Sequence, residues 1–419
     1  MTAKYTWSAK RKSRETVLAD MQVARSKDIP WYDLKNLTAS YYGGEDVAEI
    51  ARDAFCQHIG DNVVHQRGLH PSVAQYEHDV LKMTLSLFNA PKGATGTITT
   101  GGSESITLAL KSARDRARAL NPNLGTPEVI VPQSAYAVFN KACHLLGIKL
   151  IQMHTSPGHR ADVAGMRAAI SENTIMMVGS TPPFPYGLVD PIPELAAIAA
   201  EHNIWFHVDA CIGGFVLPFA KALGEDIPDF DFSVPGVTSI SCDYHKYGYA
   251  YRGCSVILLR DAELEQYQGF SANAWPAGDY YSKNVAGSRN SGPIASAWAV
   301  MQYLGYQGYL DITAQLIDAK RKYFAEIEAT EGAHLLGRAE GPHFAFTVED
   351  VDVQVLLDGL MGRGWGVNLG TKPDAILLML SHHHGAVAAE FGKDLREVLC
   401  AARAGRAEKN SDGKVYGIY

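Results

Sequence analysis

The sequence predicts an α/β protein: a large domain with a mostly parallel sheet flanked by helices, followed by a smaller C-terminal α/β domain. From about residue 80 to about residue 260, helical patterns alternate with short β-branched runs, an order typical of parallel strands joined by helices. After about residue 300 the pattern changes to a long helix, short strands and a final helix. The chain of 419 residues also exceeds what one compact core usually supports, which favours two domains.

Periodicity and end signals define the elements of the large domain. Gly147 ends the helix over 136–146, and Asp162 is expected to cap the helix over 162–170. The helix over 103–120 carries apolar residues on one face, at Ile106, Ala109, Leu110, Ala113 and Ala117. The other expected elements are helices over 46–58 and 194–202 and strands over 128–131, 149–153, 174–178 and 204–208.

We expect three regions along the chain. Residues 1–60 form an N-terminal arm with a helix, residues 61–305 the large domain, and residues 306–419 the small domain, which opens with a long helix over 309–327. The boundary is placed where the strand–helix alternation ends. The polar tail from Arg406 is expected to be mobile.

Composition excludes several classes of function. A net charge of −7 and a pI of about 6.1 argue against a nucleic-acid partner, and the short basic run at 10–14 is expected to be a solvated surface segment. No apolar run is long enough to suggest a membrane span, and neither a signal peptide nor a stable membrane anchor is evident. The six cysteines are scattered, which is typical of reduced thiols and predicts a cytoplasmic location.

One lysine, Lys246, carries the strongest chemical signal. It follows an apolar, β-leaning segment and precedes Gly248, which suggests a buried strand end, and His245 beside it is placed to contact a phosphate. A lysine amine can form an imine with a cofactor aldehyde. Lysine is also a common surface residue, so the position gains weight only from its companions.

Two companions lie upstream in the chain. Asp209 ends the run 205–209, where a carboxylate can pair with a pyridine nitrogen, although an isolated aspartate is more often a cap or a turn residue. Gly101, Gly102 and Ser103 lead into a helix whose exposed amides attract a phosphate. Each part alone is weak evidence. Together, in this order, they predict an enzyme that uses pyridoxal 5'-phosphate.

At this point the residues resemble a known family. The chain is similar to the sphingosine-1-phosphate lyases, within the group II PLP-dependent decarboxylases of fold type I. The resemblance covers roughly residues 40 to 310. Its motifs are 238–250 around the lysine, 206–215 around the aspartate, the glycine loop 100–105, the Ala-Gly-Ser-Arg element 286–289, and the blocks 127–135, 162–167 and 180–187.

The resemblance implies a role for each matching position. Lys246 becomes the Schiff-base lysine, Asp209 the partner of the pyridine nitrogen, and Tyr249 a candidate proton carrier, with a cofactor phosphate oxygen as the alternative. Gly287 and Ser288 are expected to reach the phosphate of the neighbouring subunit in a homodimer with a shared active site. Further cofactor contacts are implied for Gly101, Gly102, Ser103, Tyr136, Thr181 and His245, and substrate contacts for Tyr42, Asn62, His65, Tyr186 and Arg252.

Three positions depart from the family pattern. Tyr136 stands where the family has a histidine stacked on the cofactor; a phenol can stack but cannot replace an imidazole as acid or base. Arg252 replaces a lysine thought to hold the substrate phosphate, and arginine keeps the charge and adds bidentate recognition. Tyr244 replaces a small threonine. These departures leave cofactor binding intact and concern the identity of the substrate.

The run His382-His-His384 attracts attention as a metal motif. Three consecutive histidines cannot all face one ion on a helix or strand, and no acidic residues accompany them at suitable spacing. We therefore expect a surface or interface role and no metal.

The leading hypothesis is a PLP-dependent carbon–carbon lyase that cleaves a phosphorylated sphingoid base by retro-aldol chemistry into a long-chain aldehyde and phosphoethanolamine. The nearest alternative is an amino-acid decarboxylase, because the same electron sink serves either bond. A catalytically silent protein of the same fold is the alternative from another class. Retention of Lys246, Asp209 and the glycine loop argues against it.

Overall fold

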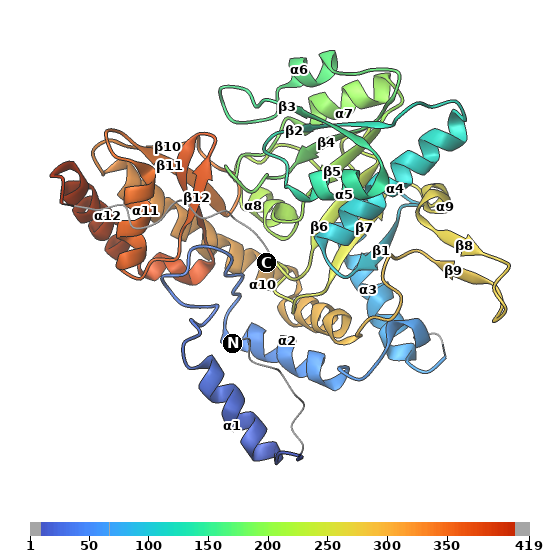
Figure 1. Cartoon of the computed structure of the whole chain (residues 1–419), viewed down its shortest axis with the longest axis horizontal. Helices are drawn as coiled ribbons and strands as arrows, with labels where there is room; N and C mark the ends of the chain where they lie inside the picture. The colour runs from blue at the N-terminus through green and yellow to red at the C-terminus, as the bar shows by residue number, and fades with distance from the viewer. Residues whose placement is uncertain (1–9, 67, 407–419) are drawn as a thin grey trace, which may run out of the picture.

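The computed structural model describes residues 10–66 and 68–406. Within these residues the large domain is built on a seven-stranded sheet of order β1-β7-β6-β5-β4-β2-β3, in which only β7 runs antiparallel to its neighbours (Figure 1). The strands are β1 (Thr95–Thr99), β2 (Glu128–Pro132), β3 (Lys149–Met153), β4 (Thr174–Ser180), β5 (Trp205–Asp209), β6 (Ser239–Asp243) and β7 (Ser255–Leu259). The predicted α/β class with a mostly parallel sheet is confirmed.

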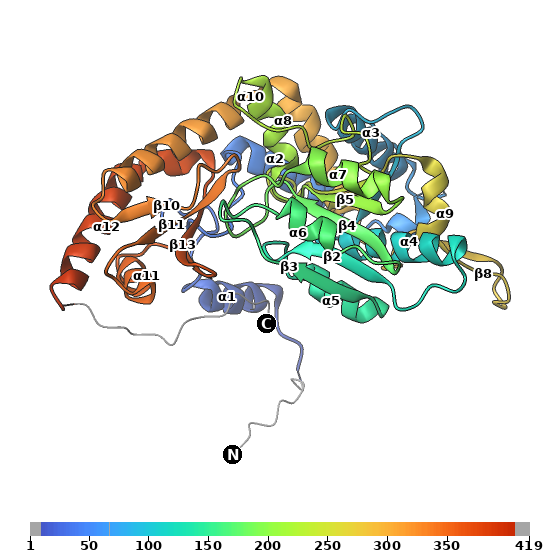
Figure 2. The same cartoon turned by 90° about the horizontal axis from the view of Figure 1, so that it is seen from above.

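Helices cover both faces of this sheet. In β2, Val129 and Val131 face one hydrophobic cluster and Ile130 faces the other, as the two-residue period of a strand requires. Figure 2 shows α5 and α7 on opposite faces. The helices of this domain are α3 (Pro71–Leu87), α4 (Gly102–Leu120), α5 (Val138–Leu146), α6 (Val163–Ala168), α7 (Ile192–Glu201), η2 (Gly213–Phe215), α8 (Leu217–Ala222), η3 (Ala262–Leu264) and α9 (Glu265–Gln268).

The sequence predictions in this domain hold apart from details at the helix ends. Gly147 ends α5 in the left-handed conformation, with φ of 64°. Asp162 occupies the N-cap position of α6, but its side chain makes no capping hydrogen bond, so the predicted cap is wrong. The turn after β6 carries Lys246, which therefore lies three residues beyond the strand end.

A long helix joins the two domains. α10 (Gly292–Glu328) is kinked at Gly305, whose φ of 54° is non-helical. The second sheet, of order β10-β11-β13-β12, is antiparallel and is covered by α11 (Val353–Gly362) and α12 (Ala388–Arg403). Its strands are β10 (Ala333–Leu335), β11 (His343–Val348), β12 (Asn368–Thr371) and β13 (Asp374–Met379). The exact domain limits at 60 and 305 stay a prediction.

The N-terminal region contains a helix that periodicity did not reveal. α1 (Arg14–Arg25) has no buried residue and stands apart from the large-domain sheet (Figure 1). It is followed by the predicted helix α2 (Glu45–Gln57) and by η1 (Val63–His65). The basic run at 10–14 is exposed, as expected. The polar tail at 407–419 lies outside the described residues.

Two of the three consecutive histidines connect the N-terminal segment to the small domain. They lie in η4 (His382–Ala386), where His382 Nδ1 contacts the Tyr42 carbonyl oxygen at 3.1 Å and His383 Nε2 contacts that of Tyr32 at 3.1 Å. In the described part of the chain, no group of three potential ligands is arranged for a metal ion. Likewise, no described helix is long and apolar enough to cross a membrane.

Candidate active site

The candidate site forms where adjacent parallel strands end. β2, β4, β5 and β6 lie in the sheet with their carboxyl ends at one edge. Tyr136 follows the first of these strands, Thr181 the second, Asp209 ends the third, and Lys246 follows the fourth. Residues that lie more than a hundred positions apart in the sequence therefore meet at one edge, the usual ligand site of such sheets.

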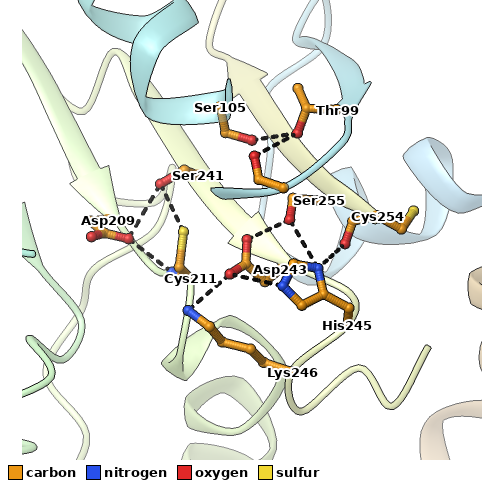
Figure 3. Close-up of polar contacts among 11 residues, drawn as sticks. Thr99, Ser105, Asp209, Cys211, Ser241, Asp243, His245, Lys246, Cys254 and Ser255 are labelled. Atoms are coloured by element: carbon orange, nitrogen blue, oxygen red, sulfur yellow. Dashed lines mark hydrogen bonds and ion pairs between the residues drawn. The ribbon is translucent and has the colours of Figure 1, made fainter. Parts of the chain in front are cut away.

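Lys246 projects into a buried polar cluster (Figure 3). Its Nζ lies 2.9 Å from Oδ2 of Asp243, and its side chain is 20% exposed. Burial by itself favours the neutral amine, but the charge of Asp243 outweighs burial, so the pKa of Lys246 lies well above its usual value. The chain turns sharply just beyond, where Tyr249 takes a φ of 60°.

Asp209 is a buried carboxylate. Its Oδ1 accepts hydrogen bonds from the Cys211 amide at 3.1 Å and, more weakly, from Ser241 Oγ at 3.4 Å. Burial is the largest effect on this group and raises the pKa of Asp209. A protonated ring nitrogen placed here would lower that pKa again and would itself keep its proton.

The glycine loop lies beside Asp243 and Cys211. A Cβ on Gly102 would come within 2.9 Å of Asp243 Oδ1 and 3.0 Å of Cys211 Sγ, so only glycine allows the loop to pass there. α4 begins at this glycine, and its first amides point out of the helix. Thr99 and Ser105, whose hydroxyls lie 2.7 Å apart, fix the loop to the helix.

Buried polar atoms without partners also point to a missing group. Among the described residues, the hydroxyls of Ser134, Ser180 and Thr181 are buried and have no hydrogen-bond partner. Such groups are costly unless a ligand or water satisfies them. A lysine amine, a buried carboxylate, an open helix start and orphaned hydroxyls together fit pyridoxal phosphate.

His245 joins this cluster to an adjoining cavity. Its Nδ1 contacts the Cys254 carbonyl oxygen at 2.8 Å, its Nε2 lies 3.8 Å from Asp243, and burial lowers the pKa of His245. The ring is therefore neutral at neutral pH, with Nδ1–H donating and Nε2 available as an acceptor.

The cavity beside His245 combines one cation with apolar walls. Its volume is about 380 Å³. The predicted residues His245, Tyr249 and Arg252 line it, and the Arg252 guanidinium lies 5.8 Å from the centre of the Tyr41 ring. The other lining residues are Trp31, Tyr41, Ala48, Ala51, Phe55, Ala250 and Tyr251.

Other predicted substrate residues are not brought to this cavity. Tyr42 packs its ring against His383, with centroids 4.9 Å apart. Tyr186 is buried and donates its hydroxyl hydrogen to the Lys372 carbonyl oxygen. Asn62 accepts from the amides of Val64 and Arg289. The side chain of His65 lies outside the described part of the structure.

The residues implied to serve a neighbouring subunit lie on the surface. Gly287 and Ser288 are exposed, in the segment that follows the hairpin of β8 (Phe270–Ala272) and β9 (Tyr280–Ser282). A larger cavity of about 840 Å³, between α3, α8 and α10, contains none of the predicted site residues.

Sequence reasoning missed three residues of the site. Asp243 precedes Lys246 by three positions at the end of a buried strand, and this register could have revealed it. Glu104 accepts from the Thr100 amide and hydroxyl at 2.7 Å each and from the Val285 amide at 2.8 Å. Because residue 285 is 181 positions away, no local signal indicates that contact. The sequence analysis assigned a substrate contact to Tyr42, whereas the neighbouring Tyr41 lines the cavity.

Comparison with known proteins agrees with this geometry. The family model described as the pyridoxal-dependent decarboxylase conserved domain matches residues 6–349. Sphingosine-1-phosphate lyase 1 of Rattus norvegicus is 37% identical over 99% of this chain and 73% of its own length. A probable L-aspartate decarboxylase of Pyrococcus furiosus is 34% identical over 85% of this chain and 92% of its own.

A solved structure supports the same assignment. The sphingosine-1-phosphate lyase of Burkholderia pseudomallei is 34% identical, with a TM-score of 0.91 over 96% of this chain and 94% of that chain. The predicted fold type I architecture and the pyridoxal phosphate cofactor are thereby confirmed. The chain belongs to the pyridoxal-dependent decarboxylase family and, as its motifs predicted, to the sphingosine-1-phosphate lyases within it.

Proposed function

We propose that this protein is a PLP-dependent lyase that cleaves a phosphorylated sphingoid base into a long-chain aldehyde and phosphoethanolamine. One observation carries the proposal: the cavity lined by His245, the residue before Lys246, pairs the Arg252 guanidinium with aromatic and aliphatic walls. A substrate with an anionic head and an apolar chain matches that combination. Several curated relatives of similar sequence, including the Rattus norvegicus enzyme, are sphingosine-1-phosphate lyases.

The residues of the cavity account for binding. Arg252 is exposed at the cavity, where its planar guanidinium can bind two phosphate oxygens at once. Trp31 and Phe55 offer apolar surface to the chain of the substrate. Roles of Tyr42, Asn62, His65 and Tyr186 in substrate binding stay predictions.

The buried cluster accounts for the chemistry. When bound, the cofactor supplies an electron sink for the pair released as the bond between the amine-bearing and hydroxyl-bearing carbons breaks. Asp209 would keep the ring nitrogen of that cofactor protonated, which the electron sink requires. Burial raises the pKa of Tyr249, so its phenol keeps its proton at neutral pH. Tyr249 therefore serves to orient the reacting hydroxyl or to donate a proton, and not as a free base.

We further propose a homodimer with a shared active site in the cytoplasm. Large apolar side chains are exposed around the β8–β9 hairpin, next to Gly287 and Ser288, and an interface would bury them. They include Phe270 at 61% exposure, Trp275 at 56% and Val285 at 69%. The location rests on the scattered, reduced cysteines of the sequence.

An amino-acid decarboxylase is the second candidate, and it rests on the Pyrococcus furiosus relative. It would use the same lysine and aspartate but would release carbon dioxide. The position of Arg252 beside apolar walls favours the lyase, because a short amino acid gains nothing from a cavity of that kind.

Product analysis tests the proposal. Purified protein with PLP is offered a phosphorylated sphingoid base and, separately, tyrosine, glutamate and aspartate. The proposal predicts long-chain aldehyde and phosphoethanolamine from the lipid and no carbon dioxide from the amino acids. Carbon dioxide with an amine, and no aldehyde, would establish the decarboxylase instead.

A further inference from the structure

One carboxylate in the buried cluster has no part in the reaction described above. Asp243 ends β6, and its side chain is 3% exposed. Its Oδ2 lies 2.9 Å from Lys246 Nζ, while its Oδ1 accepts a hydrogen bond from Ser255 Oγ at 2.6 Å. The hydroxyl on one side thus fixes the carboxylate toward the amine on the other (Figure 3).

The groups around this pair leave Asp243 as the closest counter-ion of the amine. Asp209 and Cys211 face the pair from the end of β5, His245 from the following turn, and Tyr41 from the N-terminal segment. His245 and the cysteine are neutral at neutral pH, since burial lowers the pKa of the imidazole and raises that of the thiol. The same ion pair holds the pKa of Asp243 below its usual value despite burial.

We propose that Asp243 is a positioning residue that holds the free amine of Lys246 as an ammonium ion, so that the amine must first lose a proton to solvent before it bonds to the cofactor aldehyde. The ammonium ion gives one proton to solvent water, and the amine nitrogen then forms a bond to the aldehyde carbon. The aldehyde oxygen leaves as water with the two remaining amine hydrogens, so atoms and charge balance. This role concerns attachment of the cofactor and is independent of which substrate bond the enzyme breaks.

The proposal makes a claim about rate and pH. While Asp243 is ionised, the amine is held in its unreactive, charged form, so attachment is slow at neutral pH and accelerates as pH rises. Without the carboxylate, burial of the amine is unopposed and favours the neutral, reactive form. A residue that only supported the fold would change stability and leave this pH dependence in place.

The test follows attachment in cofactor-free protein, without substrate. Wild type and Asp243→Asn are mixed with PLP from mildly acidic to mildly alkaline pH, quenched with borohydride, and the modified Lys246 peptide is quantified by mass spectrometry over time. We expect attachment in the variant to be about tenfold faster or more at neutral pH, since an opposite charge at this distance shifts a pKa by about one unit or more. Its rate should also vary less with pH.

A matched control separates this effect from the loss of any buried charge. Asp190 is also buried at the same end of the sheet, accepts from the amides of Ser180 and Ala161 at 2.8 Å each, and does not contact Lys246. Asp190→Asn should attach PLP with the wild-type rate and pH dependence. If Asp243→Asn does not yield folded protein, Asp243→Ser removes the same charge with a smaller side chain and carries the same expectation.

The result that overturns the proposal is equally defined. An Asp243 variant that attaches PLP with the wild-type pH dependence, or more slowly at every pH, would show that Asp243 does not control the proton of Lys246. Because no sphingoid base is used, failure here is distinct from failure of the lyase assignment.

Discussion

At the scale of single residues, Asp209 links stability to the cofactor. A carboxyl whose pKa is raised in the folded state binds its proton more tightly there than in the unfolded chain. Stability therefore falls as pH rises through that range, and the cofactor-free protein carries the cost at neutral pH. A cationic ring nitrogen beside Asp209 removes this cost.

The first prediction follows from the raised pKa of Asp209, which lowers the stability of the cofactor-free protein at neutral pH. Cofactor-free Asp209→Asn should unfold at a higher temperature than wild type at neutral pH, with the difference shrinking in acid. Its gain in stability on adding PLP should be smaller, and its PLP affinity about tenfold weaker, equivalent to about 1.4 kcal/mol. Thermal unfolding with and without PLP measures both. An unchanged PLP-dependent gain would contradict the assigned role.

Arg252 gives the second prediction. Arg252→Ala should raise KM for a phosphorylated sphingoid base about tenfold to a hundredfold, because hydrogen bonds to charged groups contribute about 1.5–3 kcal/mol. Steady-state kinetics with Arg338→Ala, an exposed arginine of the small domain paired with Glu328, is the control. An unchanged KM in Arg252→Ala would place the phosphate elsewhere.

The positions of single residues could be predicted where the order of the strands along the chain itself constrains the geometry. Lys246 and Asp209 follow adjacent strands of one sheet, so a strand–helix pattern suffices to bring them together. Tyr41 and Tyr42 lie in an irregular segment, where no periodicity tells which ring faces the cavity. The Tyr186 hydroxyl donates a hydrogen bond to the Lys372 carbonyl oxygen. This contact is set by packing between the domains, which the local sequence does not encode.

At the scale of elements, the regular alternation of strands and helices could be predicted from the sequence, whereas α1 and the full extent of α10 could not. The strands of the large sheet have apolar residues on both faces because helices cover both, and this makes them distinct in the sequence. α1 was not predicted from the sequence because none of its residues is buried. The extent of α10 was underestimated because the sequence of its first half carries no strong amphipathic pattern across the kink at Gly305.

Glu104 yields a prediction at this scale, because it joins the first turn of α4 to a distant loop. Its carboxylate accepts from Thr100 in the glycine loop and from the amides of Val285 and Ala286. In Glu104→Gln, a side-chain amide that donates hydrogen bonds would face backbone N–H groups that also donate. This mismatch should loosen the glycine loop. We expect PLP affinity to fall about tenfold or more, since unsatisfied buried groups cost about 1–3 kcal/mol.

Equilibrium titration with PLP, followed by cofactor absorbance, measures this change. Glu128→Gln is the matched control, because Glu128 accepts from Lys149 and Ser171 at the opposite edge of the sheet. Equal losses of affinity in the two variants would indicate general destabilisation, and wild-type affinity in Glu104→Gln would refute the link between the loops.

At the scale of the whole molecule, the exposed apolar surface beside the β8–β9 hairpin predicts association. The double variant Phe270→Ser, Val285→Ser should shift the protein from dimer to monomer in analytical ultracentrifugation. It should also weaken PLP binding, because Gly287 and Ser288, which are expected to reach the phosphate in the neighbouring subunit, follow Val285 closely in the chain. Leu145→Ser, at 69% exposure on α5, should leave the dimer intact. A double variant that remains dimeric would move the interface elsewhere.

The N-terminal region and the large domain together create the cavity in which cleavage is proposed. The measurement that tests this claim most directly is the stoichiometry of products from a phosphorylated sphingoid base, with Lys246→Ala as control. The account predicts aldehyde and phosphoethanolamine in equal amounts from wild type and neither from the variant. Full turnover by Lys246→Ala, or release of phosphoethanolamine without aldehyde, would contradict it.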